Sequence, residues 1–114
     1  MSKHRLVVFT NAMPGRDDEF NKWYDEVHLR EVVEVDGFVA AQRFVLSADQ
    51  IGELDADSVP GRYLAIYEIE ADDLKSAFDK LNAASGGSMT MSDALDSSSA
   101  KAIAYTALGE RYTG

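Results

Sequence analysis

Residues 38–70, FVAAQRFVLSADQIGELDADSVPGRYLAIYEIE, decide the fold of this chain. The two ends of the stretch, residues 38–48 and 62–70, are rich in β-branched and aromatic residues, which predicts two consecutive β-strands. The polar segment between them, residues 49–61, is long for a hairpin connection and is interpreted as a flap or a dimer arm. The stretch therefore indicates a sheet with an unusual projecting loop.

The chain before this stretch predicts a strand and then a helix. Residues 5–10, RLVVFT, have strand character and are followed by NAMPG, a run of turn formers. Asp17 or Asp18 can cap the helix that follows, and the acidic first turn suits the positive end of its dipole. An apolar stripe at helical spacing then follows: Phe20, Trp23, Tyr24 and Val27.

The apolar stripe of this helix changes phase near His28. Continued rotation of about 100° per residue would place Glu31 in the centre of the stripe. The later apolar residues form a separate set at helical spacing: Leu29, Val32 and Val33. We therefore expect a bend or a new short helix that begins around Leu29 and ends before the turn at Asp36 and Gly37.

The chain after residue 70 predicts one more helix and one more strand. Asp72 or Asp73 opens a helix with apolar positions up to residue 81, and a flexible segment covers residues 83–88. A short helical turn is expected at residues 92–95, and residues 101–108 return to strand character. The order β, α, β, β, α, β predicts an α+β, ferredoxin-like βαββαβ fold over residues 1–114, with both helices on one face of a four-stranded antiparallel sheet.

Both faces of this sheet are predicted to be apolar. In residues 38–48, alternation places Phe38, Ala40, Phe44 and Leu46 on one face and Val39, Ala41 and Val45 on the other. In residues 62–70, it places Leu64 and Ile66 opposite Tyr63, Ala65, Tyr67 and Ile69. An apolar face without a cover indicates a partner, and a second copy is the simplest one. We therefore expect a homodimer that closes a dimeric α/β barrel.

Composition narrows the range of functions. The chain has 114 residues, a formal net charge of −9 and no Cys. The negative charge disfavours nucleic acid and anionic membrane surfaces as partners, and no apolar run is long enough for a membrane span or a secretory signal, so a cytoplasmic location is expected. Without Cys, chemistry must come from His, carboxylates, Tyr, Asn, Arg or a bound cofactor.

Residues 7–44 resemble the EthD-like branch of the dimeric α/β-barrel superfamily. The resemblance is carried by Asn11, by the segment WYDEVHL at residues 23–29, and by the later GF and QRF. The resemblance implies the fold predicted above, but it is compatible with several activities. Members of the superfamily include muconolactone isomerases, polyketide cyclases, cofactor-free monooxygenases, haem-degrading enzymes and ligand-sensing domains.

His28 is the leading catalytic candidate, because imidazole both takes and gives a proton near neutral pH. In the resemblance it matches the His of the family segment. Tyr24 and Asp25 lie four and three residues before it, so on a helix the phenol could donate a hydrogen bond to the ring and the carboxylate could orient it. Asp25 and the helix end together predict a raised His28 pKa. The alternative is a structural His that caps carbonyls or bridges to a surface carboxylate.

Four further residues are candidates for substrate binding. Asn11 could hold a carbonyl or oxyanion, or could form an Asx turn ahead of Pro14. Trp23 and Tyr67 could line a cavity, or could belong to the core. Arg43 or Gln42 must point into an apolar layer, and it would need a partner such as a carboxylate. His4 opens the first strand and is interpreted as a surface residue, although a second His would also suit a cyclase or isomerase.

The leading hypothesis is a cofactor-independent acid/base enzyme of isomerase, cyclase or lyase type. It would act on a small aromatic or polyketide-like metabolite in a pocket between sheet and helices, with His28 moving a proton next to a carbonyl. The alternatives are a cofactor-free or haem-dependent monooxygenase and a non-catalytic ligand-binding barrel. A metal site at Asp25, His28 and Glu31 is disfavoured, since one His among carboxylates is a thin ligand set.

Overall fold

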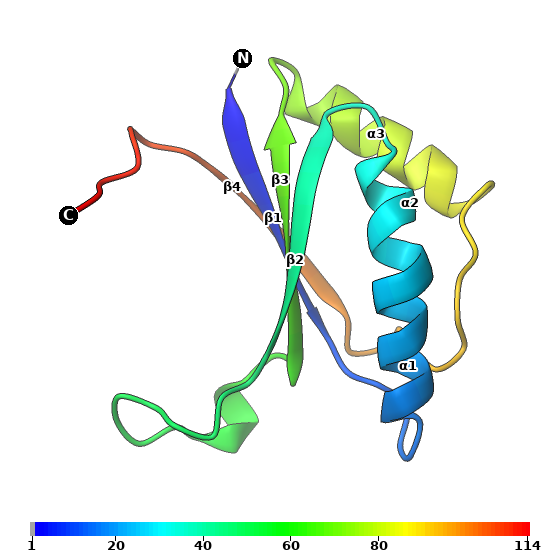
Figure 1. Ribbon diagram of the computed structural model, residues 1–114, viewed down its shortest axis with the longest axis vertical. Helices are drawn as coiled ribbons and strands as arrows, with labels where there is room; N and C mark the ends of the chain where they lie inside the picture. The colour runs from blue at the N-terminus through cyan, green and yellow to red at the C-terminus, as the bar shows by residue number, and fades with distance from the viewer. Residues whose placement is uncertain (1) are drawn as a thin grey trace.

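The computed structural model describes residues 2–114 and shows a sheet with helices packed on one of its faces (Figure 1). The elements are β1 (Lys3–Thr10), α1 (Asp17–Trp23), a π-helical turn η1 (Tyr24–His28), α2 (Leu29–Val33), β2 (Phe38–Val45), a 3-10 turn η2 (Ala56–Ser58), β3 (Tyr63–Glu70), α3 (Leu74–Ser85) and β4 (Lys101–Thr106). The strands lie in the order β2-β3-β1-β4, and every pairing is antiparallel. This arrangement confirms the predicted α+β, ferredoxin-like βαββαβ fold.

A β-bulge in β2 corrects the predicted faces of that strand. Phe38 pairs with Ile69, but the next paired residue is Ala40, opposite Glu68, so the register shifts by one residue. A one-residue shift reverses which face each later side chain occupies. Arg43 is therefore on the helix side with Phe38, and the predicted grouping of Phe38 with Ala40 and Phe44 was wrong. The predicted faces of β3 are confirmed by its strict alternation of buried and half-buried residues.

The long N-terminal helix has its phase change where the sequence indicates. Tyr24–His28 form a π-helical turn between α1 and α2, and the Leu29 N–H donates to the Tyr24 carbonyl five residues earlier. A π-helical turn accommodates one extra residue, which is why the apolar stripe restarts at Leu29. The expected cap was wrong, because the N-cap residue is Arg16 and makes no side-chain capping bond. Asp17 instead accepts a hydrogen bond of 2.6 Å from the Tyr63 hydroxyl.

Several other boundaries differ from the prediction. β2 ends at Val45 and β4 at Thr106, both earlier than expected, whereas α3 continues to Ser85. The Asp73 carboxylate caps α3 by accepting from the Ser76 N–H at 3.2 Å, as one of the two expected caps. Residues 92–95 form a single turn, in which the Leu95 N–H donates to the Ser92 carbonyl at 3.4 Å, and Leu95 also makes an isolated bridge with Ala12 near the end of β1.

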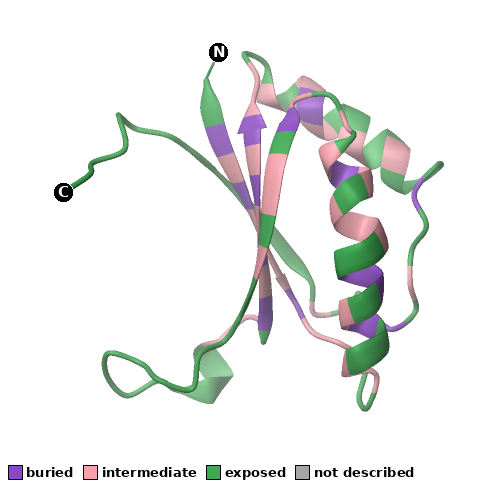
Figure 2. Cartoon of the chain, in the orientation of Figure 1, coloured by how far each residue is buried: buried purple, intermediate pink, exposed green. Residues whose placement is uncertain are grey.

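The core fills the space between the sheet and the helices. It is built around a group of aromatic side chains from α1, η1, β2 and β3: Phe20, Trp23, Tyr24, Phe38, Tyr63 and Tyr67. The opposite face of the sheet carries no layer of this chain, and β4 is exposed along its whole length (Figure 2). Within residues 2–114, no helix is both long and apolar enough to cross a membrane.

Candidate functional site

The π-helical turn brings His28 onto the indole of Trp23. The two ring centroids lie 4.7 Å apart with an interplanar angle of 21°, a stacked arrangement. Residues five apart point in different directions on an α-helix, but on a π-helix they lie one above the other. The Trp23 Nε1–H donates to the Thr90 carbonyl at 2.8 Å, which fixes the indole plane. The unusual turn thus holds the imidazole against a rigid aromatic surface.

His28 is held as a neutral imidazole. Its Nδ1 is buried and has no hydrogen-bond partner within the described part of the chain. Burial lowers the pKa of His28 below its ordinary value, and the nearby negative charge of Glu31 opposes this only in part. The predicted raised pKa was therefore wrong, because desolvation outweighs the carboxylate and Asp25 is engaged elsewhere.

Tyr24 lies at the centre of the cluster and contacts His28 through its ring. The Tyr24 and His28 rings meet edge to face, with centroids 4.9 Å apart. The Tyr24 hydroxyl is hydrogen-bonded to the Tyr67 hydroxyl at 3.0 Å, so the expected phenol-to-imidazole hydrogen bond is absent among the described residues. Burial raises the pKa of both phenols, most strongly that of Tyr67. Both hydroxyls consequently remain protonated at neutral pH.

Arg43 also contacts Tyr24 and has the carboxylate partner that the sequence predicts. Its guanidinium carbon is 4.5 Å from the centroid of Tyr24, and Phe20 and Tyr63 also lie within 5.4 Å of it. The guanidinium donates to the Asp25 carboxylate at 3.0 Å. Asp25 therefore pairs with Arg43, and the predicted orientation of His28 by Asp25 was wrong.

The sequence alone missed Asn21 as part of this cluster. The Arg43 guanidinium donates to the Asn21 side-chain Oδ1 at 2.9 Å, and the Asn21 side-chain amide donates to the Tyr63 hydroxyl at 3.4 Å. Asn21 is four residues before Asp25, so both point toward β2 from the same face of the helix. That spacing, together with an Arg in the middle of a strand, was the signal that could have revealed the network.

The sequence alone also did not reveal the contact that Glu31 makes with residue 90. Both of its carboxylate oxygens accept from the Thr90 N–H, at 3.1 Å each. Since Trp23 bonds to the Thr90 carbonyl, the segment 86–99 is fixed across the helix from two sides. The polar residue that interrupts the apolar stripe in the sequence is thus the one that holds this segment beside His28.

Asn11 and His4 have structural partners. The Asn11 side-chain Oδ1 accepts from the Arg62 N–H at 2.9 Å, and its side-chain amide donates to the Ser99 hydroxyl at 3.1 Å. His4 is buried, contrary to the surface position expected, and its ring nitrogens lie 2.9 Å from the Thr106 hydroxyl and 3.1 Å from the Ala71 carbonyl. Each side chain joins segments that are distant in sequence.

A cavity of about 510 Å³ opens beside Arg43 at the β2 edge. Its lining includes Asn21, Asp25 and Tyr63 but not His28. Tyr24 thus contacts both His28 and Arg43, whereas the cavity beside Arg43 is not lined by His28. Within residues 2–114, no group of three or more His, Asp and Glu side chains is arranged to hold a metal ion.

Comparison with solved structures shows the same fold in several proteins. The heme-degrading protein MhuD from Mycobacterium tuberculosis, solved with two hemes in its active site, matches with a TM-score of 0.63 at 13% identity, covering 96% of this chain and 99% of that one. An EthD family protein from Bacillus halodurans matches with a TM-score of 0.57 at 15% identity, covering 98% and 100%. A proposed monooxygenase from Shewanella loihica matches with a TM-score of 0.56 at 16% identity, covering 96% and 99%.

These matches confirm the ferredoxin-like α+β fold, and one of the matched proteins belongs to the EthD family that the sequence resembles. Their sequence identities are low enough that the likeness concerns the fold alone. No protein-family model matches the chain, and neither does any curated protein. The function must therefore be argued from the residues themselves.

Proposed function

We propose that this protein is a cofactor-independent acid/base enzyme with His28 as its general base. The observation that carries the proposal is a neutral imidazole whose buried Nδ1 has no partner within residues 2–114. Buried polar atoms are nearly always paired, so an unpaired one calls for an explanation. A nitrogen that accepts a proton only from a substrate meets this requirement.

The proposed step is removal of a proton from carbon next to a carbonyl. A neutral His28 accepts the proton, the electron pair moves into an enolate, and the resulting imidazolium returns the proton to the same or another carbon. This step gives isomerisation without any oxidant or reductant, and it also starts cyclisation or elimination. Trp23 fixes the ring plane by stacking, and small aromatic or polyketide-like ketones suit the aromatic surroundings.

Deuterium exchange tests this step without knowledge of the natural substrate. We expect the protein to accelerate exchange of the C–H protons of 2-tetralone in D2O, followed by proton NMR. Replacement His28→Gln should reduce the catalysed rate by about 10² or more, the usual contribution of a general base. Glu26→Gln, an exposed neighbour on the same turn, is the matched control and should retain the rate. Equal exchange by wild type and His28→Gln would refute the role of His28.

A second candidate is a monooxygenase, which is favoured by the two structural neighbours described as a heme degrader and a proposed monooxygenase. Oxygen consumption with hydroxylated aromatic compounds separates the two candidates, because proton transfer alone consumes no oxygen. Activity that persists under nitrogen supports the acid/base enzyme. Activity that requires oxygen supports the monooxygenase.

The residues fit a haem poorly. The chain has two His and no Cys. Both ring nitrogens of His4 are hydrogen-bonded, and His28 is packed against the rings of Trp23 and Tyr24, which crowds out a porphyrin more than a small substrate. Haem reconstitution followed by absorption spectroscopy should accordingly give no intense Soret band.

We also propose that the protein is a homodimer that pairs through the open face of its sheet. The apolar residues on this face support the proposal, because a monomer rarely leaves such a surface uncovered. They come from β1, β2, β3 and β4: Val7, Phe9, Phe44, Leu64, Ile66 and Ile103. Sedimentation at micromolar concentration tests it, and a monomer there would contradict it.

A further inference from the structure

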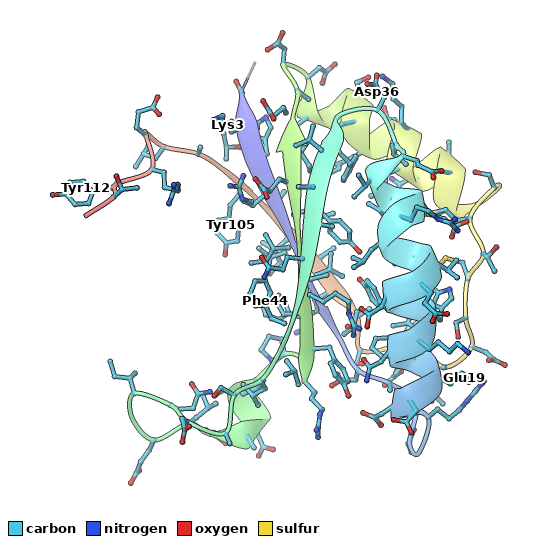
Figure 3. All side chains as sticks on the ribbon, viewed as in Figure 1. Lys3, Glu19, Asp36, Phe44, Tyr105 and Tyr112 are labelled. Atoms are coloured by element: carbon cyan, nitrogen blue, oxygen red, sulfur yellow. The ribbon has the colours of Figure 1, made fainter. Side chains whose placement is uncertain are left out.

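The segment 86–99, which follows α3, runs back along the side of the N-terminal helix before the chain enters β4 (Figure 1). Figure 3 labels Glu19 near the start of this helix and Asp36 just past its end, and the segment follows the helix between them. The segment forms turns and one isolated bridge rather than a helix or a strand. Its position therefore depends on its contacts with neighbouring elements.

Two side chains of the helix converge on Thr90 in this segment. The Trp23 Nε1–H donates to the Thr90 carbonyl at 2.8 Å, and both carboxylate oxygens of Glu31 accept from the Thr90 N–H at 3.1 Å. One loop residue is thus held through both of its backbone groups. A hydrogen bond to an ionised carboxylate is roughly twice as strong as one between neutral groups, so Glu31 is the stronger of the two attachments.

The π-helical turn is what places Trp23 and Glu31 on one face of the helix. On a straight α-helix, residues 23 and 31 would point about 80° apart, at about 100° per residue. The turn accommodates one extra residue, which reduces this difference to about 20°. His28 lies between them in sequence and stacks on Trp23, with ring centroids 4.7 Å apart. The three side chains therefore share the face along which the segment 86–99 runs.

The two rings that contact His28 are fixed in different ways. Tyr24, which meets the imidazole edge to face, is hydrogen-bonded through its hydroxyl to Tyr67 in the buried core. Trp23 instead donates its hydrogen bond to a loop carbonyl, so the orientation of the indole depends on where Thr90 lies. A base that removes a proton from carbon must be held at a defined angle to its substrate. The Trp23 side of this arrangement is the one that needs support.

We propose that Glu31 is a positioning residue for His28. Glu31 fixes Thr90, Thr90 fixes the plane of the Trp23 indole, and the indole fixes the imidazole that stacks on it. The proposal rests on the acid/base function proposed above, and it adds a residue that acts through others without touching the substrate. Loss of Glu31 should therefore affect the reaction of a bound ketone more than its binding.

Two substitutions at Glu31 separate position from charge. Glu31→Gln keeps an oxygen that can accept from the Thr90 N–H, whereas Glu31→Ala does not. Both remove the negative charge that partly opposes the lowered pKa of His28, so both should lower that pKa alike. A difference between the two variants therefore reports the position of the ring and not its protonation. Glu34→Ala, at an exposed position of the same helix end, is the matched control.

The first measurement is deuterium exchange of 2-tetralone at about pH 7.5, where His28 is neutral in every variant. We expect Glu31→Ala to lower the maximal rate about tenfold or more with little change in KM, because a misplaced base slows the reaction of bound ketone. Glu31→Gln should recover most of the rate, and Glu34→Ala should retain it. An unchanged maximal rate in Glu31→Ala, or an equal loss in Glu31→Gln, would overturn the proposal.

The second measurement does not depend on activity. Trp23 is the only Trp of the chain, so acrylamide quenching of the fluorescence reports on it alone. Stacking on the indole should shift the NMR signals of the His28 ring protons upfield. Glu31→Ala should diminish this shift and increase the quenching, and Glu31→Gln should largely restore both. Loss of the shift in a protein whose wild type catalyses no exchange would refute the acid/base function alone. An unchanged shift beside an active wild type would refute the positioning role alone.

Replacement Trp23→Phe tests the route from a second side. It keeps an aromatic ring beside His28 but removes the N–H that donates to Thr90. If Glu31 acts through this bond, the double variant Trp23→Phe and Glu31→Ala should lower the maximal rate no further than the larger single effect. Effects that multiply would show that Glu31 acts by another route and would contradict the proposal.

Discussion

The two faces of the sheet differ in how far their apolar side chains are buried and their polar groups are hydrogen-bonded. On the helix side, the polar groups among the aromatic rings are engaged in specific bonds, with the Nδ1 of His28 as the exception among the described residues. On the open side, apolar side chains are left half-exposed, and apart from the pair between Arg5 and Glu68 the polar contacts are few. The side chains on the helix side are buried and bonded within one chain, whereas those on the open side remain partly exposed.

This difference separates two kinds of function. On the helix side, burial lowers the pKa of His28 below its ordinary value. On the open side, the uncovered apolar side chains offer surface that a partner could bury. Mutations on the helix side should therefore act within each chain, and mutations on the open side should act through association.

The largest effect should come from a matched pair of Phe replacements. Phe20 is fully buried among the aromatic rings, whereas Phe44 is 41% exposed on the open face. Phe20→Ala should lower the free energy of unfolding by about 3–5 kcal/mol at every protein concentration. Phe44→Ala should lower Tm in a manner that depends on concentration, because it should weaken the proposed homodimer. Urea unfolding at several concentrations measures both. If Phe44→Ala lowered Tm by the same amount at every protein concentration, the predicted difference between the two faces would be wrong.

The next effect concerns the buried pair of Tyr24 and Tyr67. Replacing either by Phe leaves the other hydroxyl without its partner and should cost about 1–3 kcal/mol. Replacing both removes the two polar groups together and should cost less than the sum of the single changes. A double-mutant cycle from urea unfolding measures the coupling. Strict additivity would show that the hydroxyl pair contributes nothing as a pair.

Arg43 and Asp25 form an ion pair whose two members should differ in importance. The Arg43 side chain is 12% exposed and stacks on three aromatic rings, whereas that of Asp25 is 59% exposed. Arg43→Met should cost about 1–2 kcal/mol through lost cation–π and hydrogen-bonding contacts. Asp25→Asn should cost less than about 1 kcal/mol, because exposed ion pairs are weak. Equal losses would mean that the ion pair outweighs the stacking.

Sequence periodicity was sufficient for the fold and for the position of His28. The break in the apolar stripe identified the junction, because one inserted residue shifts every later position on a helix. Periodicity could not show that the junction is a π-helical turn. It also could not show the stacking of His28 on Trp23 that this turn produces. The bulge near Ala40 escaped for a similar reason, since a bulge alters strand alternation without a required residue type.

The partners of the site residues were harder to predict than their positions. Asp25 lies three residues before His28, but burial and stacking decide its partner, and Arg43 reaches it from another element. The pKa of His28 depends on how many atoms surround the ring, which local sequence does not report. Asn11 forms no Asx turn, because the Met13 N–H donates to the Ala94 carbonyl; its side chain bonds instead to the Arg62 N–H and the Ser99 hydroxyl, a bridging role that the sequence did not indicate.

The smallest effect is the pH dependence of stability that His28 contributes. Its pKa is lower in the folded protein than the ordinary value of about 6.5 expected in the unfolded chain. The unfolded state therefore binds more protons between these two pKa values, and stability rises with pH across that window. The contribution is complete above about pH 6.5 and is lost as the pH falls toward the folded pKa.

Urea unfolding between about pH 7.5 and 5.5 measures this slope above the range in which ordinary carboxylates titrate. His28→Gln removes the titrating group and should flatten the part of the slope that His28 causes. An NMR titration of the ring gives the folded pKa directly. A value above that of the model imidazole would reverse the sign of the slope. It would also remove the neutral base on which the proposed proton transfer depends, so this small effect tests the site more directly than the larger ones.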